Sequence, residues 1–134
     1  MFWSREEKEK KKLAKLKRQE AYDRVYKLHQ EAEFICYIDE ICEEEYQGEL
    51  CVKLVGNIAM GEGTVQEQYS LYSCEGRWKG TVDIEEFYVG ADKVNQLDGS
   101  DKQVAIYPKQ RELAFKAGDI LCKLRRKMDA TDYQ

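Results

Sequence analysis

The side chains best suited to covalent chemistry are five cysteines and a single histidine. A cysteine attacks as its thiolate, and a neighbouring base such as histidine raises the thiolate fraction. His29 falls in a segment with helical spacing, whereas Cys74, the cysteine in the most loop-like surroundings, comes much later in the chain. We favour a packing role for His29. The sequence therefore predicts a protein that is not an enzyme and has no catalytic residue.

The cysteine and carboxylate patterns also argue against disulfides and metal centres. The cysteine count is odd and no two cysteines form a CxxC pair. Cys36, Cys51 and Cys122 lie in apolar runs, where a free thiol packs as a small hydrophobic group. The acidic groups at 43–45 and 98–101 do not follow the calcium-loop pattern. With no signal-peptide pattern at the start, we expect reduced thiols, no metal, no cofactor and a cytoplasmic location.

Residues suited to binding are more frequent. Trp78 lies between Arg77 and Lys79 in a connector bracketed by glycines. There its indole can stack on a partner's base or side chain, or can close one end of the fold. A second candidate set is basic and consists of Lys10, Lys11, Lys12, Lys15, Lys17 and Arg18. We predict that both sets contact a partner.

The basic set lies in a segment, residues 4–32, that has the pattern of one helix. Ser4 and Glu7 have the spacing of a capping box, and no glycine or proline occurs in residues 1–46. The second half carries an apolar stripe at helical spacing, made by Ala21, Val25, Leu28 and Ala32. A second row at helical spacing holds Tyr22, Tyr26 and His29. We expect the second half, about residues 20–33, to dock on another surface, and the first half to project into solvent or to pair with a partner.

Charge divides the chain in the same way. Residues 1–33 hold 10 Lys and Arg against 7 Asp and Glu, and residues 34–134 hold 12 against 19. The acidic body repels phosphate backbones and is a poor nonspecific nucleic-acid binder. The basic segment can contact RNA, an anionic lipid surface, an acidic protein or its own acidic body. No apolar run approaches the roughly 20 residues that cross a bilayer, so we expect no membrane contact.

From residue 34 the pattern changes to short strands. Apolar runs at 34–38, 50–55, 69–72, 80–88, 104–107 and 120–122 are separated by turn-like segments at 43–48, 98–101 and 117–119. This spacing is typical of a sandwich or barrel, and closing the sheet removes exposed edges. We expect a mainly β protein: a charged N-terminal helix at 1–33, a small, closed, mostly antiparallel β-barrel at 34–124, and a frayed tail at 125–134.

The order of these strands and their glycines forms a recognisable series. A hydrophobic-Gly-x-Ile-x-x-Gly step is present as Val55-Gly56-Asn57-Ile58-Ala59-Met60-Gly61. It is followed by Tyr69-Ser70-Leu71-Tyr72, by Val82-Asp83-Ile84-Glu85 with one fewer spacer residue, by Val104-Ala105-Ile106-Tyr107 and by Phe115-Lys116-Ala117-Gly118-Asp119-Ile120-Leu121. Over residues 34–124 this series resembles the β-barrel second domain of translational GTPases, the elongation factor Tu type.

The resemblance implies a stand-alone translation-protein barrel that contacts a protein or ribonucleoprotein. GTP hydrolysis is excluded because the chain has no G-x-x-x-x-G-K-[ST] phosphate loop. The segment 98–101 departs from the family's turn before Val104. The acidic run 43–45 counts against an inherited contact with transfer or ribosomal RNA. Our main hypothesis is a non-enzymatic binding module. The alternatives are an RNA- or ribosome-associated factor anchored by the basic helix, and a self-assembling structural protein that pairs through that helix as a homo-oligomer.

Overall fold

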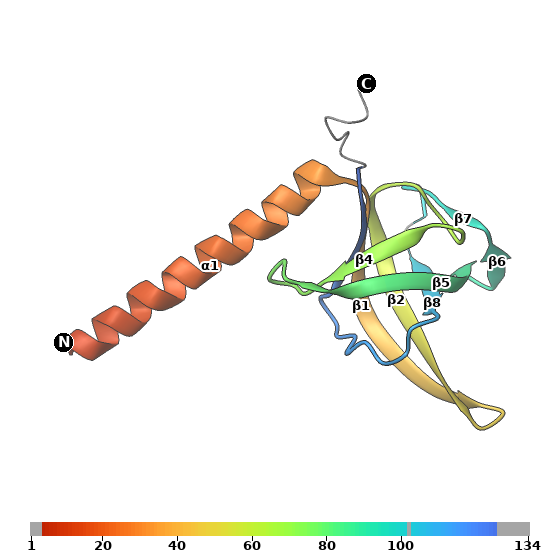
Figure 1. Cartoon of the computed structure of the whole chain (residues 1–134), viewed down its shortest axis with the longest axis horizontal. Coiled ribbons are helices and arrows are strands. Elements are labelled where there is room, and N and C mark those ends of the chain that lie inside the picture. Colours follow the sequence, from red (N-terminus) through yellow and green to blue (C-terminus); the bar gives the residue numbers. More distant parts are fainter. Residues whose placement is uncertain (1–3, 102, 126–134) are drawn as a thin grey trace, which may run out of the picture.

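A computed structural model describes residues 4–101 and 103–125, and shows one N-terminal helix followed by strands (Figure 1). In chain order the elements are α1 (Arg5–Glu31), β1 (Ala32–Tyr46), β2 (Glu49–Gly61), β3 (Gly63–Thr64), β4 (Gln68–Tyr72), β5 (Trp78–Val89), β6 (Asp92–Val94), β7 (Gln96–Leu97), β8 (Val104–Pro108) and β9 (Ile120–Leu124). Of the tail predicted at 125–134, all but Arg125 lies outside the described residues.

Local hydrogen bonds define both ends of helix α1. The Oγ of Ser4 accepts a hydrogen bond from the backbone N–H of Glu7 at 3.3 Å, which satisfies one of the free donors of the first turn. At the other end, the backbone N–H of Ala32 donates to the carbonyl of Leu28 while Ala32 itself is extended. The chain therefore passes from helix to strand without a loop. The helix predicted at 4–32 is confirmed.

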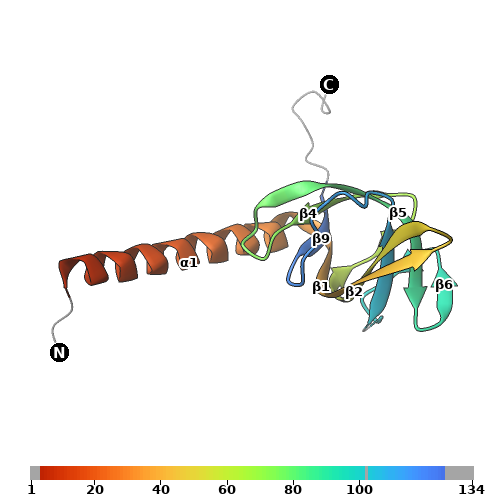
Figure 2. The same cartoon turned by 90° about the horizontal axis from the view of Figure 1, so that it is seen from below.

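Only the second half of α1 contacts the strands. Leu28 and Ala32 are buried with Ile35, Ile120 and Cys122, and Val25 packs against this cluster. Residues 5–20 are all exposed. Figures 1 and 2 show the first half extending away from the sheet as a straight arm. The second half of α1 therefore docks, as predicted, and in this single chain the first half projects.

The strands form a mostly antiparallel sheet, as predicted. Seven strands follow the hydrogen-bonded order β4-β9-β1-β2-β8-β5-β6, and β4 also pairs with β5. The short strands β3 and β7 pair separately. The core of the sheet contains the rings of Phe34, Tyr69 and Phe87, which meet edge to face with centroids 5.5 and 6.3 Å apart.

Two details of the sequence prediction were wrong. The acidic run 43–45 is not a turn, because β1 continues through it and pairs with β2 until Tyr46 meets Glu49. The turn is at Gln47 and Gly48, which have φ angles of 54° and 80°. The glutamates are tolerated in the strand because they are exposed on a hairpin that extends beyond the pairing of β1 with β9 (Figure 1). Trp78 likewise opens β5 instead of lying in a connector.

Candidate partner-binding site: a basic arm and the groove at its base

The first 15 residues of α1, 5–19, form what we call the arm. Between Lys10 and Arg18 the arm carries six cationic side chains and no acidic one. All of them are exposed. Among the described residues, no ion pair includes Lys10, Lys12, Lys15, Lys17 or Arg18. Their charge is therefore available to an external anion.

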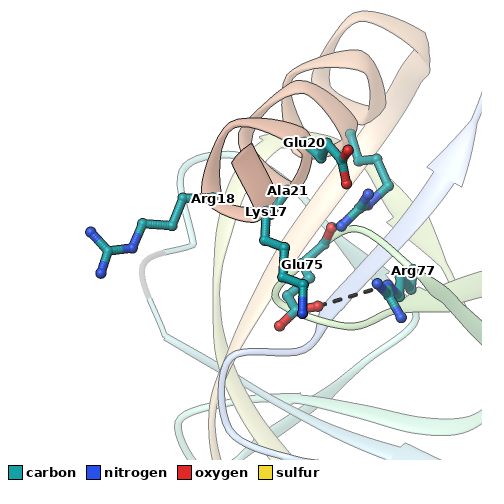
Figure 3. A pocket seen from close by; sticks show the side chains of 7 residues that line it. Lys17, Arg18, Glu20, Ala21, Glu75 and Arg77 are labelled. Carbon is teal, nitrogen blue, oxygen red and sulfur yellow. Dashed lines mark hydrogen bonds and ion pairs between the residues drawn. The ribbon is translucent and has the colours of Figure 1, made fainter. Parts of the chain in front are cut away.

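A groove of about 350 Å³ lies at the base of the arm, between α1 and the loop that joins β4 to β5 (Figure 3). It is lined by Lys17, Arg18, Glu20, Ala21, Arg24, Glu75 and Arg77. Four of these side chains are cationic and two are acidic, so the lining carries a net positive charge. Figure 3 shows Lys17 and Arg77 directed toward Glu75, while the guanidinium of Arg18 points away from the loop.

The loop wall of the groove is held by its own hydrogen bonds. The Oγ of Ser73 accepts from the backbone N–H groups of Glu75 and Arg77, at 3.3 and 3.2 Å. The N–H of Ser73 donates to the carbonyl of Arg77 at 2.7 Å, and the N–H of Gly76 donates to the carbonyl of Ser73 at 2.9 Å. This wall is therefore ordered before any partner arrives.

The loop is also fixed to the helix. The Nε of Arg24 donates to the carbonyl of Glu75 at 2.8 Å. Next to it Gly76 has a φ of +80°, and a Cβ there would lie only 2.8 Å from the Cβ of Arg24. The two walls thus approach as closely as a glycine permits, and the groove is preformed.

Glu75, one of the two acids that line the groove, is only weakly paired. The Nε of Arg77 lies 3.7 Å from Oε2 of Glu75, and both side chains are more than half exposed. An exposed pair of this kind stabilises a protein by at most about 1 kcal/mol. Arg77 can therefore turn to a stronger anionic partner at little cost.

The structure separates eight of the nine predicted contact residues into three groups, and the ninth, Lys79, has an internal role. Lys17, Arg18 and Arg77 line the groove. The other four predicted lysines of α1, Lys10, Lys11, Lys12 and Lys15, lie along the arm. Trp78 is 62% exposed at the start of β5 and lines none of the groove.

Lys79 has an internal role. Its Nζ donates to Oδ2 of Asp119 at 2.7 Å and also to the carbonyl of Ala114. The Lys79 and Asp119 side chains are only 19% and 4% exposed. The same carboxylate accepts from the backbone N–H of Lys116 at 2.8 Å. Lys79 therefore holds the turn before β9 and is not free to contact a partner.

Arg24 and Glu75 belong to the groove but were not predicted. Arg24 follows Lys17 by seven residues, or two helical turns, so the sequence places both on one face of α1. No local pattern indicates that the loop at 73–77 lies against that face.

The structure gives the thiols and the histidine no shared site. All five cysteines are free, and burial raises the pKa of both Cys36 and Cys122 to about 12, so these two pack as hydrophobic groups, as predicted. His29 Nε2 hydrogen-bonds to the hydroxyl of Tyr37, while Cys74 is exposed in the β4–β5 loop. Within residues 4–101 and 103–125, no group of three or more metal-ligating side chains lies close enough to hold an ion.

Comparison with known proteins adds no identity to this geometry. The sequence matches no protein-family model, and no curated protein is significantly similar to it. In the described part of the chain, no helix has the length and apolar character needed to span a membrane. The arm and its groove are the features of the described chain that are best suited to binding a partner.

Proposed function

We propose that the protein is a non-enzymatic binding module whose basic arm and groove hold an anionic protein or ribonucleoprotein partner. One observation carries this proposal. Lys17 and Arg77, 60 residues apart in the sequence, line the same groove at the base of an arm whose cations are exposed. If the lysines of α1 formed only a solvated helix face, we would not expect a cation from a distant loop to lie beside them.

Physical cost also favours binding at this place. The groove walls are already fixed by the bond from Arg24 to the carbonyl of Glu75, so little conformational entropy is lost when a partner docks. The clustered positive charge attracts anions over a distance of about 8 Å at physiological salt. Because the rest of the chain is acidic, it would direct an anionic partner toward the arm.

The sheet that carries the arm would be a closed barrel of the translation-protein type. This proposal is supported by the pairing of β4 with both β9 and β5, which makes a continuous ring of β4, β9, β1, β2, β8 and β5. The glycines of the sequence resemblance are also at corners: Gly61 ends β2 with a φ of +81°, and Gly118 precedes β9 with a φ of +95°. The five free thiols fit a reducing, cytoplasmic location.

The proposal is tested by affinity capture from a cell extract with the full chain. The arm variant Lys10→Gln/Lys12→Gln/Lys15→Gln is compared with a charge-matched control, Lys27→Gln/Lys109→Gln/Lys116→Gln, whose side chains are also exposed. We expect wild type and control to retain the same partner at 100 mM salt and the arm variant to lose it. Raising the salt should release the partner from wild type, because the contact is between charges.

The three possible results lead to different conclusions. A partner lost only from the arm variant supports the proposal. Equal retention by all three proteins would overturn it, since the arm would then have no part in binding. Equal loss from both variants would also count against it, because net charge alone would then explain the capture.

A further inference from the structure

A second surface of α1 is not used by the groove. Steps of four and three residues place a row of side chains on one helix face, which we call the outward stripe: Lys8, Lys12, Lys15, Gln19, Tyr22 and Tyr26. All six side chains are exposed. The apolar side chains of α1 that dock on the sheet, Val25 and Leu28, lie on a different face of the helix. The stripe is thus cationic toward the free end of the arm and aromatic toward its base.

The two tyrosines form one aromatic surface. Their ring centroids are 6.4 Å apart, and the ring planes differ by only 16°. Tyr22 is 66% exposed and Tyr26 is 57% exposed. Both are on the docked half of α1, where Val25, which lies between them in the sequence, packs on the sheet. Two adjacent, parallel and open rings on a rigid helix are a ready platform for stacking.

The rest of the stripe complements this platform. The Nε2 of Gln19 donates to Oδ1 of Asp23 at 3.1 Å. This bond fixes the orientation of the Gln19 amide, whose oxygen can accept a hydrogen bond from a ligand. Lys15 and Lys12 lie one and two turns from Gln19, toward the N-terminus of α1. A ligand that lies along the stripe therefore meets flat apolar rings, then a polar amide, then two positive charges.

We propose that the outward stripe binds single-stranded RNA, with bases stacked on Tyr22 and Tyr26 and phosphates held by Lys12 and Lys15. This proposal rests on the proposed function and names its partner class. Proteins that bind single strands combine cations along the phosphates with aromatic side chains on which successive bases stack. The stripe supplies both on one face.

Other anionic partners use less of the surface. An acidic peptide would satisfy the lysines but would leave the parallel ring faces without a flat partner. Duplex nucleic acid keeps its bases inside the helix, where the rings cannot stack on them. RNA presents unpaired bases in loops, bulges and ends, and cellular DNA is largely paired, so RNA is the source to which we commit. The acidic body repels phosphates and so confines the contact to the arm.

The test is fluorescence anisotropy of a labelled, unstructured 12-nucleotide RNA titrated with the full chain at several salt concentrations. Tyr22→Leu/Tyr26→Leu removes the rings and keeps apolar side chains, whereas Tyr22→Phe/Tyr26→Phe keeps the rings. We expect the leucine variant to bind at least about 10-fold more weakly and the phenylalanine variant to bind within about twofold of wild type. Leu50→Ala, which removes an exposed apolar side chain from β2 and leaves α1 unchanged, is the control and should leave the affinity unchanged.

Salt dependence reports on the lysines separately. Lys12→Gln/Lys15→Gln should lower the slope of log affinity against log salt by about 1.4, because each lost phosphate contact removes about 0.7. The tyrosine variants should leave that slope unchanged. Circular dichroism of each variant checks that α1 remains helical, so that a lost contact is distinguished from a lost helix.

Several results would overturn the inference. These are no binding of the RNA, equal affinity of the leucine variant and wild type, tighter binding of a duplex of the same length, or displacement of the RNA by an equal charge of poly-glutamate. Each of them leaves the proposed function intact if the arm variant still loses its partner in the capture experiment. If the arm variant retains its partner in the capture experiment as wild type does, the proposed function itself fails.

Discussion

Lys123 joins three segments that are far apart in the sequence. Its Nζ lies 2.7 Å from Oε1 of Glu33 and 2.7 Å from Oε1 of Glu67. Glu33 is in β1, Glu67 precedes β4 and Lys123 is in β9, so one ammonium group links three segments. Glu67 is further bound by the backbone N–H of Thr64 and by the hydroxyl of Tyr69. At the residue scale, this is one contact whose loss in acid should weaken the protein.

We predict that Glu67→Gln makes stability less dependent on acid. The hydrogen bond from Lys123 lowers the pKa of Glu67, against the opposing effect of burial. A carboxyl whose folded pKa is below its unfolded pKa, about 4.3, stabilises the fold above that value and loses this contribution as the pH falls through the folded pKa. Urea unfolding should therefore show the variant less stable than wild type at pH 7, with the difference vanishing at low pH.

Glu112→Gln is the matched control for that prediction, because Glu112 is exposed. Its stability should follow wild type at every pH. A Glu67→Gln variant whose stability runs parallel to wild type from pH 7 to pH 3 would show that the Lys123 contact has no part in the acid response.

At the scale of elements, the arm depends on a small attachment. Leu28 is the only residue of α1 that is buried among those described, and Val25 packs beside it. A hydrogen bond between His29 and Tyr37 and another from Arg24 to the carbonyl of Glu75 add to this attachment. The close approach at Gly76 makes the contact of Arg24 possible. The direction of the arm and the shape of the groove therefore depend on a glycine outside the helix.

We predict that Gly76→Ala destabilises the protein more than Gly90→Ala. Both glycines have positive φ angles, +80° and +63°, so each alanine pays a backbone penalty of about 1–2 kcal/mol. A Cβ at Gly90 meets nothing within 4 Å, whereas one at Gly76 would lie 2.8 Å from the Cβ of Arg24. The additional loss at Gly76, about 1 kcal/mol or more, should appear in urea unfolding.

One result would contradict the prediction for the two glycines. If the two variants lose the same stability, the loop at 73–77 does not press on α1 and the groove is not preformed. Binding measured with the arm's partner should weaken in Gly76→Ala and remain unchanged in Gly90→Ala, because only the first position shapes the groove.

At the scale of the whole molecule, charge and pairing are both arranged over long distances. The positive arm extends from one side of the sheet, and the hairpin with the acidic run 43–45 extends from another (Figure 1). Between them, β4 pairs with β9 on one side and with β5 on the other. If the ring of strands is closed, β4 has no open edge.

We predict that successive amides of β4 exchange slowly with deuterium. A strand paired on both sides has its alternate N–H groups bonded to different neighbours, so Ser70, Leu71 and Tyr72 should all be protected. The control is β6, which among the described strands pairs with β5 alone and should show protection at alternate residues. Alternating protection in β4 would mean that one of its two pairings opens in solution and that the barrel is not closed.

Much of the fold follows from short-range rules that the sequence displays. The cap at Ser4 and the absence of glycine and proline predict α1, and the row from Ala21 to Leu28 predicts its docked half. Apolar runs separated by turns predict most of the strands and a mostly antiparallel sheet. The turn predicted at 43–45 was wrong because a run of glutamates is compatible both with a turn and with an exposed strand.

What the sequence by itself determined is therefore the set of elements and the separation of a basic helix from an acidic body, since both depend on neighbouring residues. Tertiary structure decided which cations meet. Arg77 joins Lys17 because β4 and β5 bring their loop against α1, and Lys79, two positions later, turns inward to Asp119. The two side chains have the same charge and neighbouring positions, and only the packing of distant strands distinguishes a contact residue from a structural one.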